Sequence, residues 1–324
     1  MPPECEEVEI RGMLENNERI DRTATSKSPK LPVLCDRRAM VSKFWCQEIS
    51  RRWRQRRQET PHARLLTEPK CQSHVTIWYL FYRWIVFLIW TAFVVCSLFE
   101  LGSYQPLRMY DKWPIYLTHW DVALGFSQAL IGGILVLKRW RLQRIPGFNP
   151  CNLRLEFTER LYWFLYVVTT NIAIGVTVCY WLAVYNPEIH YLDPLNIMMH
   201  VCNSVLMLID LFVTSIPFRL RNFWWSLSIA MFYVMFTVIY YAAGGLNKEG
   251  YPYIYKILDW KKPARTIPLC AGGLTLVTVL HCVLCMLAHT RDRLYRRITG
   301  KLNSRSVHIT TNEKSLTGKR TEMV

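Results

Sequence analysis

A threonine and a histidine inside two long apolar segments are the residues of this sequence best suited to chemistry. His200 lies in the segment 195–213, and Thr118 lies in the segment 115–137. A threonine hydroxyl becomes a useful nucleophile when a neighbouring base takes its proton, and histidine is the usual base. The two residues therefore predict hydrolysis by a threonine nucleophile, provided that their side chains meet.

Three further polar residues share the helix faces of this threonine and this histidine, as an angle of about 100° per residue predicts. An amide there suits the stabilisation of an oxyanion, and a carboxylate suits the orientation or charge balance of a histidine. Lipid satisfies none of these groups, so both faces must point toward other helices or a water-filled cavity. The three supporting candidates are Asn203, Asp121 and Asp210.

Two alternatives to hydrolysis remain open for these residues. Polar side chains often hold membrane helices together by hydrogen bonds worth about 0.6 kcal/mol, which alone explains Asn203. A metal site is the second alternative, because four of the residues are of ligand type. These four are His119, Asp121, His200 and Asp210. We expect no cofactor.

The elements that must position these residues are six apolar segments of about 20 residues, long enough to cross a hydrocarbon core of roughly 30 Å. We therefore predict an all-α polytopic membrane protein, a bundle of six transmembrane helices that occupies residues 77–289. The predicted helices are 77–98, 115–137, 161–184, 195–213, 223–243 and 267–288.

Basic residues predict the orientation of this bundle. The chain has 40 Lys and Arg against 24 Asp and Glu, for a net charge of +16. We attribute this excess to membrane topology and expect no nucleic-acid partner. The loops after the second and fourth helices are basic, whereas the loop 185–194 carries only acidic charges. Both termini are therefore expected to be cytoplasmic, and one loop, 246–266, is basic and argues the opposite way.

Polar tails flank the predicted bundle. Residues 1–76 form a cytoplasmic tail that begins acidic and is expected to be disordered to about residue 38. Residues 40–58 repeat apolar side chains at helical spacing among arginines. They fit either an interfacial helix on anionic lipid headgroups or a basic tail without fixed structure. The basic tail 290–324 is also expected to be cytoplasmic and disordered.

Two ionisable residues inside the predicted helices are given no chemical role. Arg83 lies near the start of the first helix, from which its long side chain is expected to snorkel to the headgroups. His281 lies toward the cytoplasmic end of the sixth helix, far in depth from the other candidates, and is expected to be a packed histidine.

Three blocks of the sequence carry a family resemblance, within residues 75–291. They are WPIYLTHWD, HVCNSVLMLIDLFVTSIPFRL and AAGGLNKEGYPYIYKILDW. These blocks resemble the rolling stone proteins, multi-pass membrane proteins of insect myoblast fusion. The resemblance implies a role in myoblast fusion, muscle development or cell contact, at the plasma membrane rather than the endoplasmic reticulum.

The rolling stone group is in turn similar to the androgen-induced family of membrane proteins. Members of that family hydrolyse fatty acid esters of hydroxy fatty acids with an intramembrane threonine and histidine. By position these two residues match Thr118 and His200. The resemblance thus implies two hypotheses: a membrane protein of cell contact, and an intramembrane threonine hydrolase whose substrate is a lipid ester.

Overall fold

The computed structural model describes residues 62–187 and 192–321, with side chains as far as residue 299. The predicted interfacial helix 40–58 lies outside the described residues. The chain forms two compact units. One unit includes His62 and Asn149–Leu153 among the described residues, and the other, which comprises 63–148 and the chain from 154 onward, contains every helix long enough to cross a membrane.

Six helices of this second unit are long and apolar enough to span a bilayer, which confirms the predicted number. Their candidate membrane-crossing stretches comprise 20–37 residues each, the longest being residues Pro263–Thr299 of α9, enough to cross the hydrocarbon core at a rise of 1.5 Å per residue. The described residues contain no β-strand, only one isolated bridge. The spans are α3 (Ile77–Phe99), α4 (Leu117–Leu142), α5 (Phe157–Cys179) extended by η4 (Tyr180–Val184), α6 (Pro194–Ile197) continued by η5 (Met198–Cys202) and α7 (Asn203–Val213), α8 (Phe223–Ala242) and α9 (Pro263–Thr321).

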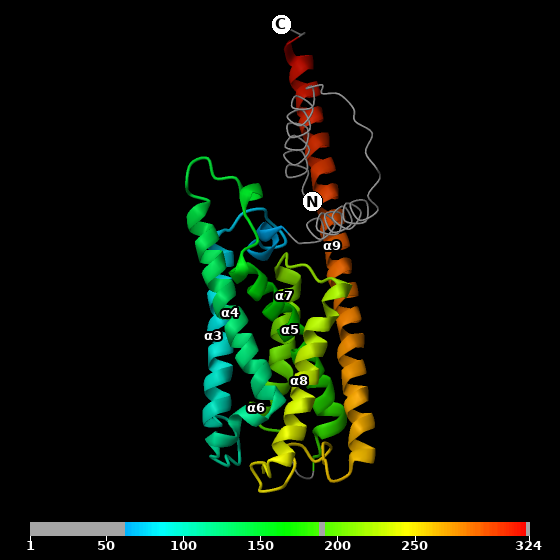
Figure 1. Ribbon diagram of the computed structural model, residues 1–324. Coiled ribbons are helices and arrows are strands. Elements are labelled where there is room, and N and C mark those ends of the chain that lie inside the picture. The colour runs from blue at the N-terminus through cyan, green and yellow to red at the C-terminus, as the bar shows by residue number, and fades with distance from the viewer. Residues whose placement is uncertain (1–61, 188–191, 322–324) are drawn as a thin grey trace, which may run out of the picture. The chain divides into compact units, whose positions relative to one another are not determined.

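The helices run side by side in the second unit, with α3 beginning at what we call the upper end (Figure 1). The opposite, lower end holds the loops that follow α3, η4 and α8. Helix α5 is central, because it packs against α4, α7, α8 and α9. Fourteen residues of α5 are buried, against eleven of α4, so polar groups on α5 and its neighbours are shielded from lipid.

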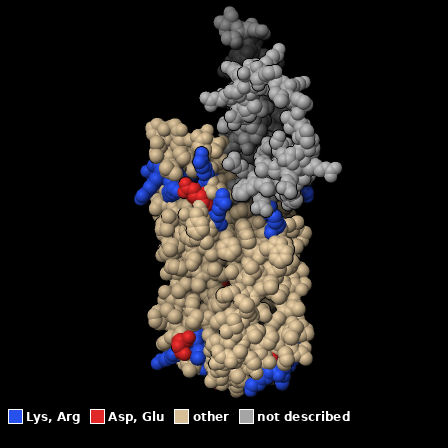
Figure 2. Space-filling view, viewed as in Figure 1, with Lys and Arg blue, Asp and Glu red and all other residues tan. Residues whose placement is uncertain are grey.

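Charged side chains on the visible face lie near the two ends of this unit, and the band between them is uncharged (Figure 2). Large apolar side chains are exposed along the same helices, among them Phe81, Leu88 and Met235. Exposed apolar surface of this extent is typical of contact with lipid rather than water. The distribution identifies the uncharged band as the part that lies in the hydrocarbon.

Part of the predicted N-terminal tail is folded against the upper end. Leu66 is fully buried there, and the backbone amide of Lys70 donates to the carbonyl of Val213 over 2.7 Å. Glu68 accepts from Arg64 over 2.7 Å and from Arg139 over 3.0 Å. Burial raises the pKa of Glu68 even though both arginines oppose that shift. A continuous ordered connection therefore leads into α3.

Helix α9 extends past the predicted end of the sixth helix at residue 288 and reaches Thr321. The prediction that the chain beyond Arg291 is disordered is therefore wrong for its described backbone. Arg291 supplies the physical reason at the upper end, because its guanidinium donates to three carbonyls in the last turn of α7 and just beyond its end, where helical partners are lacking. These acceptors are Leu211 at 2.7 Å, Thr214 at 3.0 Å and Ile216 at 3.3 Å.

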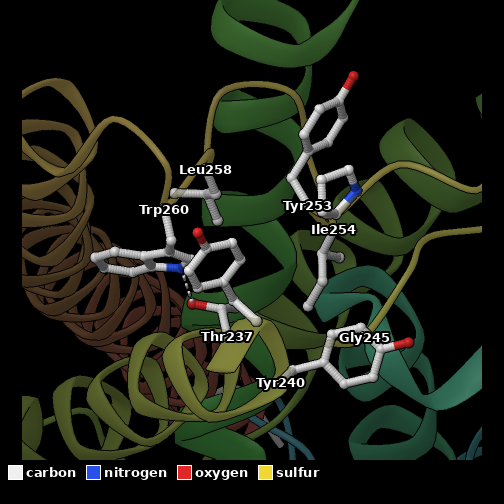
Figure 3. A pocket seen from close by; sticks show the side chains of 9 residues that line it. Thr237, Tyr240, Gly245, Tyr253, Ile254, Leu258 and Trp260 are labelled. Atoms are coloured by element: carbon white, nitrogen blue, oxygen red, sulfur yellow. Dashed lines mark hydrogen bonds between the residues drawn. The ribbon is translucent and has the colours of Figure 1, made fainter. Parts of the chain in front are cut away.

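The loop between α8 and α9 is fastened to the lower end. Lys248 forms an ion pair of 2.5 Å with Glu100, at the end of α3. Trp260 Nε1 donates to Thr237 Oγ1 of α8 over 3.2 Å, and side chains of α8 and of the loop together line a small pocket beside this bond (Figure 3). The pairing with Glu100 neutralises one of the basic residues that argued against the predicted orientation.

Acidification is expected to loosen this loop. Burial raises the pKa of Glu100, but hydrogen bonds from Lys248 and two backbone amides outweigh it, so the pKa is lowered from its ordinary value of 4.5. A carboxyl with a depressed pKa stabilises the fold above its unfolded pKa and loses that contribution as the pH falls through its folded pKa. The protection of the amides of 246–262 against hydrogen exchange, relative to the intrinsic rate at each pH, should therefore fall below pH 4.5.

Glu100→Gln is the control for this pH effect. It is expected to cost about 1–3 kcal/mol, as loss of a charged hydrogen bond does, and to give fast exchange of the loop at neutral pH. An unchanged pH dependence of loop exchange in Glu100→Gln would show that another group controls the loop.

Candidate functional site

A hydrogen bond between α4 and α7 joins the polar faces of the second and fourth spans. Asn203 Nδ2 donates to Asp121 Oδ2 over 2.9 Å, and both side chains are fully buried. The orientation of the Asn203 amide is fixed, because its oxygen accepts from the backbone amide of Ser204 over 2.7 Å. Two of the three predicted supporting residues therefore contact each other, as helix-to-helix hydrogen bonds in membranes do.

Thr118 lies in the first turn of α4, where the helix lacks a side-chain cap of its own. Tyr255 from the α8–α9 loop takes that place: its hydroxyl accepts from the amide of Leu117 over 3.1 Å and also bonds to the Thr118 side chain. Burial raises the pKa of Tyr255. Thr118 is itself only 8% exposed, so the hydroxyl predicted to be a nucleophile is shielded from the lower surface.

His200 lies in a π-helical turn, η5, at the start of the fourth span. Its ring stacks on that of Tyr180, with centroids 3.5 Å apart, and Tyr180 begins the second π-helical turn, η4. Single π-turns within α-helices often occur at functional sites. The sequence periodicity of 3.6 residues per turn does not reveal either π-turn, so this feature of the site was missed.

The register of the two helices sets the positions of Thr118 and His200. Each lies three residues before a member of the Asp121–Asn203 bond, about one helical turn closer to the lower end. The second and fourth spans run in the same direction, and the bond places Asp121 and Asn203 at the same depth. Thr118 and His200, each three residues earlier, therefore also lie at similar depths. The Thr118 side chain bonds to Tyr255, and the His200 ring stacks on Tyr180; these contacts do not join Thr118 to His200.

Asp210 is separated from this group and forms an ion pair with Arg83. Arg83 Nη1 lies 2.8 Å and 2.9 Å from the two carboxylate oxygens, and neither side chain is exposed. Tyr82 donates to the same carboxylate over 2.8 Å, and Arg83 Nη2 donates to the Tyr162 hydroxyl over 2.8 Å. The prediction that Arg83 snorkels to the headgroups is wrong, because a carboxylate on α7 holds the guanidinium inside the bundle.

The metal alternative is contradicted for the described residues. No group of three or more His, Cys, Asp or Glu side chains there is close enough to hold a metal ion. His119 instead stacks on Trp113 and donates through Nδ1 to the Trp113 carbonyl over 2.5 Å. His281 is fully buried and donates through Nε2 to the carbonyl of Arg219 over 3.0 Å, which confirms that it is a packed histidine.

A bundle of six membrane-crossing helices, with an ion pair and a polar group sealed in its interior, defines a multi-pass membrane protein. Within that class, the chain belongs to the rolling stone family: the family model described as Protein rolling stone matches residues 63–308. Protein rolling stone of Drosophila melanogaster is 28% identical over 194 residues, which cover 57% of this chain and 70% of that protein. No solved structure matches the chain.

Proposed function

We propose that the protein is an intramembrane threonine hydrolase that cleaves lipid esters, such as fatty acid esters of hydroxy fatty acids. The observation that carries this proposal is the Asn203–Asp121 hydrogen bond. It ties together the two polar helix faces one turn above Thr118 and His200, which are the residues of the correct types for a nucleophile and its base. The exposed apolar side chains of the uncharged band put the bundle in contact with lipid, the class of substrate that the proposal requires.

The chemistry assigns one role to each residue. His200 accepts the hydroxyl proton of Thr118 while Thr118 Oγ1 forms a bond to the ester carbonyl carbon. The bond from that carbon to the alcohol oxygen then breaks, and the alcohol leaves with the proton from His200. A water molecule, activated by the same histidine, hydrolyses the acyl-threonine and regenerates the hydroxyl. Asn203 retains one N–H beyond its bond to Asp121 with which to approach the developing oxyanion.

Labelling of the purified full-length protein by a fluorophosphonate probe tests this proposal. Thr118→Ala and His200→Ala are each expected to abolish labelling, whereas Thr118→Ser retains a hydroxyl and should retain label. Thr170→Ala is the matched control, since Thr170 is also a buried threonine and its hydroxyl donates within its own helix, to the carbonyl of Tyr166. Absence of label on folded wild type, or equal labelling of Thr118→Ala, would overturn the hydrolase.

Membership of the rolling stone family supports a cellular role as well, in cell contact or myoblast fusion at the plasma membrane. Depletion of the protein from fusing myoblasts is expected to reduce the number of multinucleate cells, and wild type is expected to restore it. Rescue by Thr118→Ala would separate this role from hydrolysis. Normal fusion after complete depletion would contradict the cellular role while leaving the hydrolase proposal intact.

The orientation that accompanies this role has the upper end in the cytoplasm. Exposed arginines at that end support it, because cytoplasmic loops are enriched in Lys and Arg. Together with the flanking segments 1–76 and 290–324, they offer positive charge to anionic lipid headgroups. Epitope tags at both termini should be accessible to antibody only after permeabilisation of the plasma membrane. The exposed arginines include Arg141, Arg144, Arg160, Arg221 and Arg293.

A further inference from the structure

Asp121 is a buried carboxyl without a cation. Its side chain is fully buried, and Asn203 Nδ2 is its hydrogen-bond donor on Oδ2, while Oδ1 has no hydrogen-bond partner. The other fully buried aspartate of the described residues, Asp210, has a cation and more donors. It receives two bonds from Arg83 and one from Tyr82.

An ionised carboxylate at Asp121 is physically untenable. Transfer of an unpaired charge into an apolar interior costs more than the net stability of a folded protein, so such a group takes up a proton instead. The described helices packed around Asp121 place no positive charge beside it: α3 contributes Trp90, which lies against Gly125, and α7 contributes Asn203. Helix α5, which also packs against α4, carries no Lys, Arg or His after Arg160. The Arg83–Asp210 pair is neutral as a unit, and His200 lies one turn closer to the lower end.

The geometry also determines which oxygen carries the proton. Asn203 donates an N–H to Oδ2, and its own oxygen is held by the Ser204 amide, so the Asn203 side chain cannot turn to accept from Asp121. The proton therefore lies on Oδ1, the oxygen without a partner. Because side chains on a helix lean toward its N-terminus, the Asp121 carboxyl lies over the turn that carries Thr118.

We propose that Asp121 is a neutral carboxylic acid whose O–H donates a hydrogen bond to the carbonyl oxygen of a lipid ester. This assignment of a substrate-binding group rests on the proposed hydrolase. A neutral acid in an apolar site is an effective donor, because it stabilises a developing oxyanion without introducing a second negative charge. The role differs from charge balance of a histidine, for which Asp121 would have to be an anion.

Infrared spectroscopy of the full-length protein in lipid nanodiscs tests the protonation state directly. The carbonyl stretch of a protonated carboxyl is well separated from the carboxylate bands. We expect Asp121→Asn, which preserves shape and a donor, to remove one such band at neutral pH. Labelling of wild type with ¹³C-aspartate should shift the same band and requires no variant. Absence of a shifted protonated band would overturn the proposal.

Ligand binding is tested without turnover. A lipid in which an amide replaces the ester retains the carbonyl and resists cleavage, whereas the matched ether lacks the carbonyl. The amide is expected to shift the Asp121 band to lower frequency, and the ether is expected to leave it unchanged. A band that neither lipid moves would overturn the binding role. A band shifted by the amide in a protein that never takes the fluorophosphonate label would retain the site and refute only the hydrolase.

A hydrophobic carbodiimide, which modifies protonated carboxyls, gives an internal comparison within one molecule. Peptide mapping is expected to find the adduct on Asp121 and not on Asp210, whose carboxylate is ionised against Arg83. Equal modification of the two aspartates, or modification of Asp210 alone, would contradict the assignment.

Discussion

Arg83→Met is expected to lower the free energy of unfolding by about 3–5 kcal/mol. The substitution leaves the Asp210 carboxylate buried with only the Tyr82 hydroxyl as a side-chain donor, and it removes the bond from the guanidinium to Tyr162. Most of the cost arises from this uncompensated charge rather than from the lost attraction. Denaturant or thermal unfolding of the purified protein in detergent micelles measures the loss.

The double variant Arg83→Met with Asp210→Asn separates the two origins of that cost. Both charges are then absent, so we expect the double variant to be more stable than Arg83→Met alone. Arg141→Met is the control, since Arg141 is exposed at the end of α4, and it should change stability by less than about 0.5 kcal/mol. Equal losses in Arg83→Met and Arg141→Met would show that the buried pair is not what holds α3 to α7.

The six spans were predictable because their length and apolar composition are local properties of the chain. The same holds for the polar faces, since the spacing of Asp121 from Thr118 and of Asn203 from His200 gives their angles on a helix directly. The contact between Asp121 and Asn203 was not predicted, because the angle of a residue on its helix shows that it needs a partner away from lipid but not which helix supplies that partner.

Partners from distant segments were not predictable in the same way. Arg83 and Asp210 are 127 residues apart, and the angular position of each on its helix does not identify the neighbouring helix. From sequence alone, an arginine near a helix end is expected to snorkel to the headgroups, and only the structure identifies the Asp210 carboxylate with which Arg83 pairs. Tyr255 was missed for a related reason: it lies in a loop, and its role as the cap of α4 depends on how that loop folds back.

Gly125→Ala is expected to destabilise the protein by about 1–3 kcal/mol, although alanine is the better helix former. A Cβ at this position would overlap the six-membered ring of Trp90, which is itself fully buried between α3 and α4. Gly133→Ala, two turns further along α4, is the matched control. The added Cβ would lie 3.8 Å from Trp84, which is an ordinary van der Waals contact. Gly133→Ala should therefore raise the free energy of unfolding by up to about 1 kcal/mol, because alanine is the better helix former.

The same substitution connects packing with the candidate site. Gly125 lies one turn from Asp121 on α4, so the helix must move away from α3 to accommodate the added methyl group. That movement displaces Asp121 relative to Asn203, and we expect Gly125→Ala to reduce fluorophosphonate labelling more than Gly133→Ala does. Trp90→Leu combined with Gly125→Ala frees the space and should restore part of both losses. Equal unfolding free energies for the Gly125 and Gly133 variants would show that the close approach of α3 to α4 is not required.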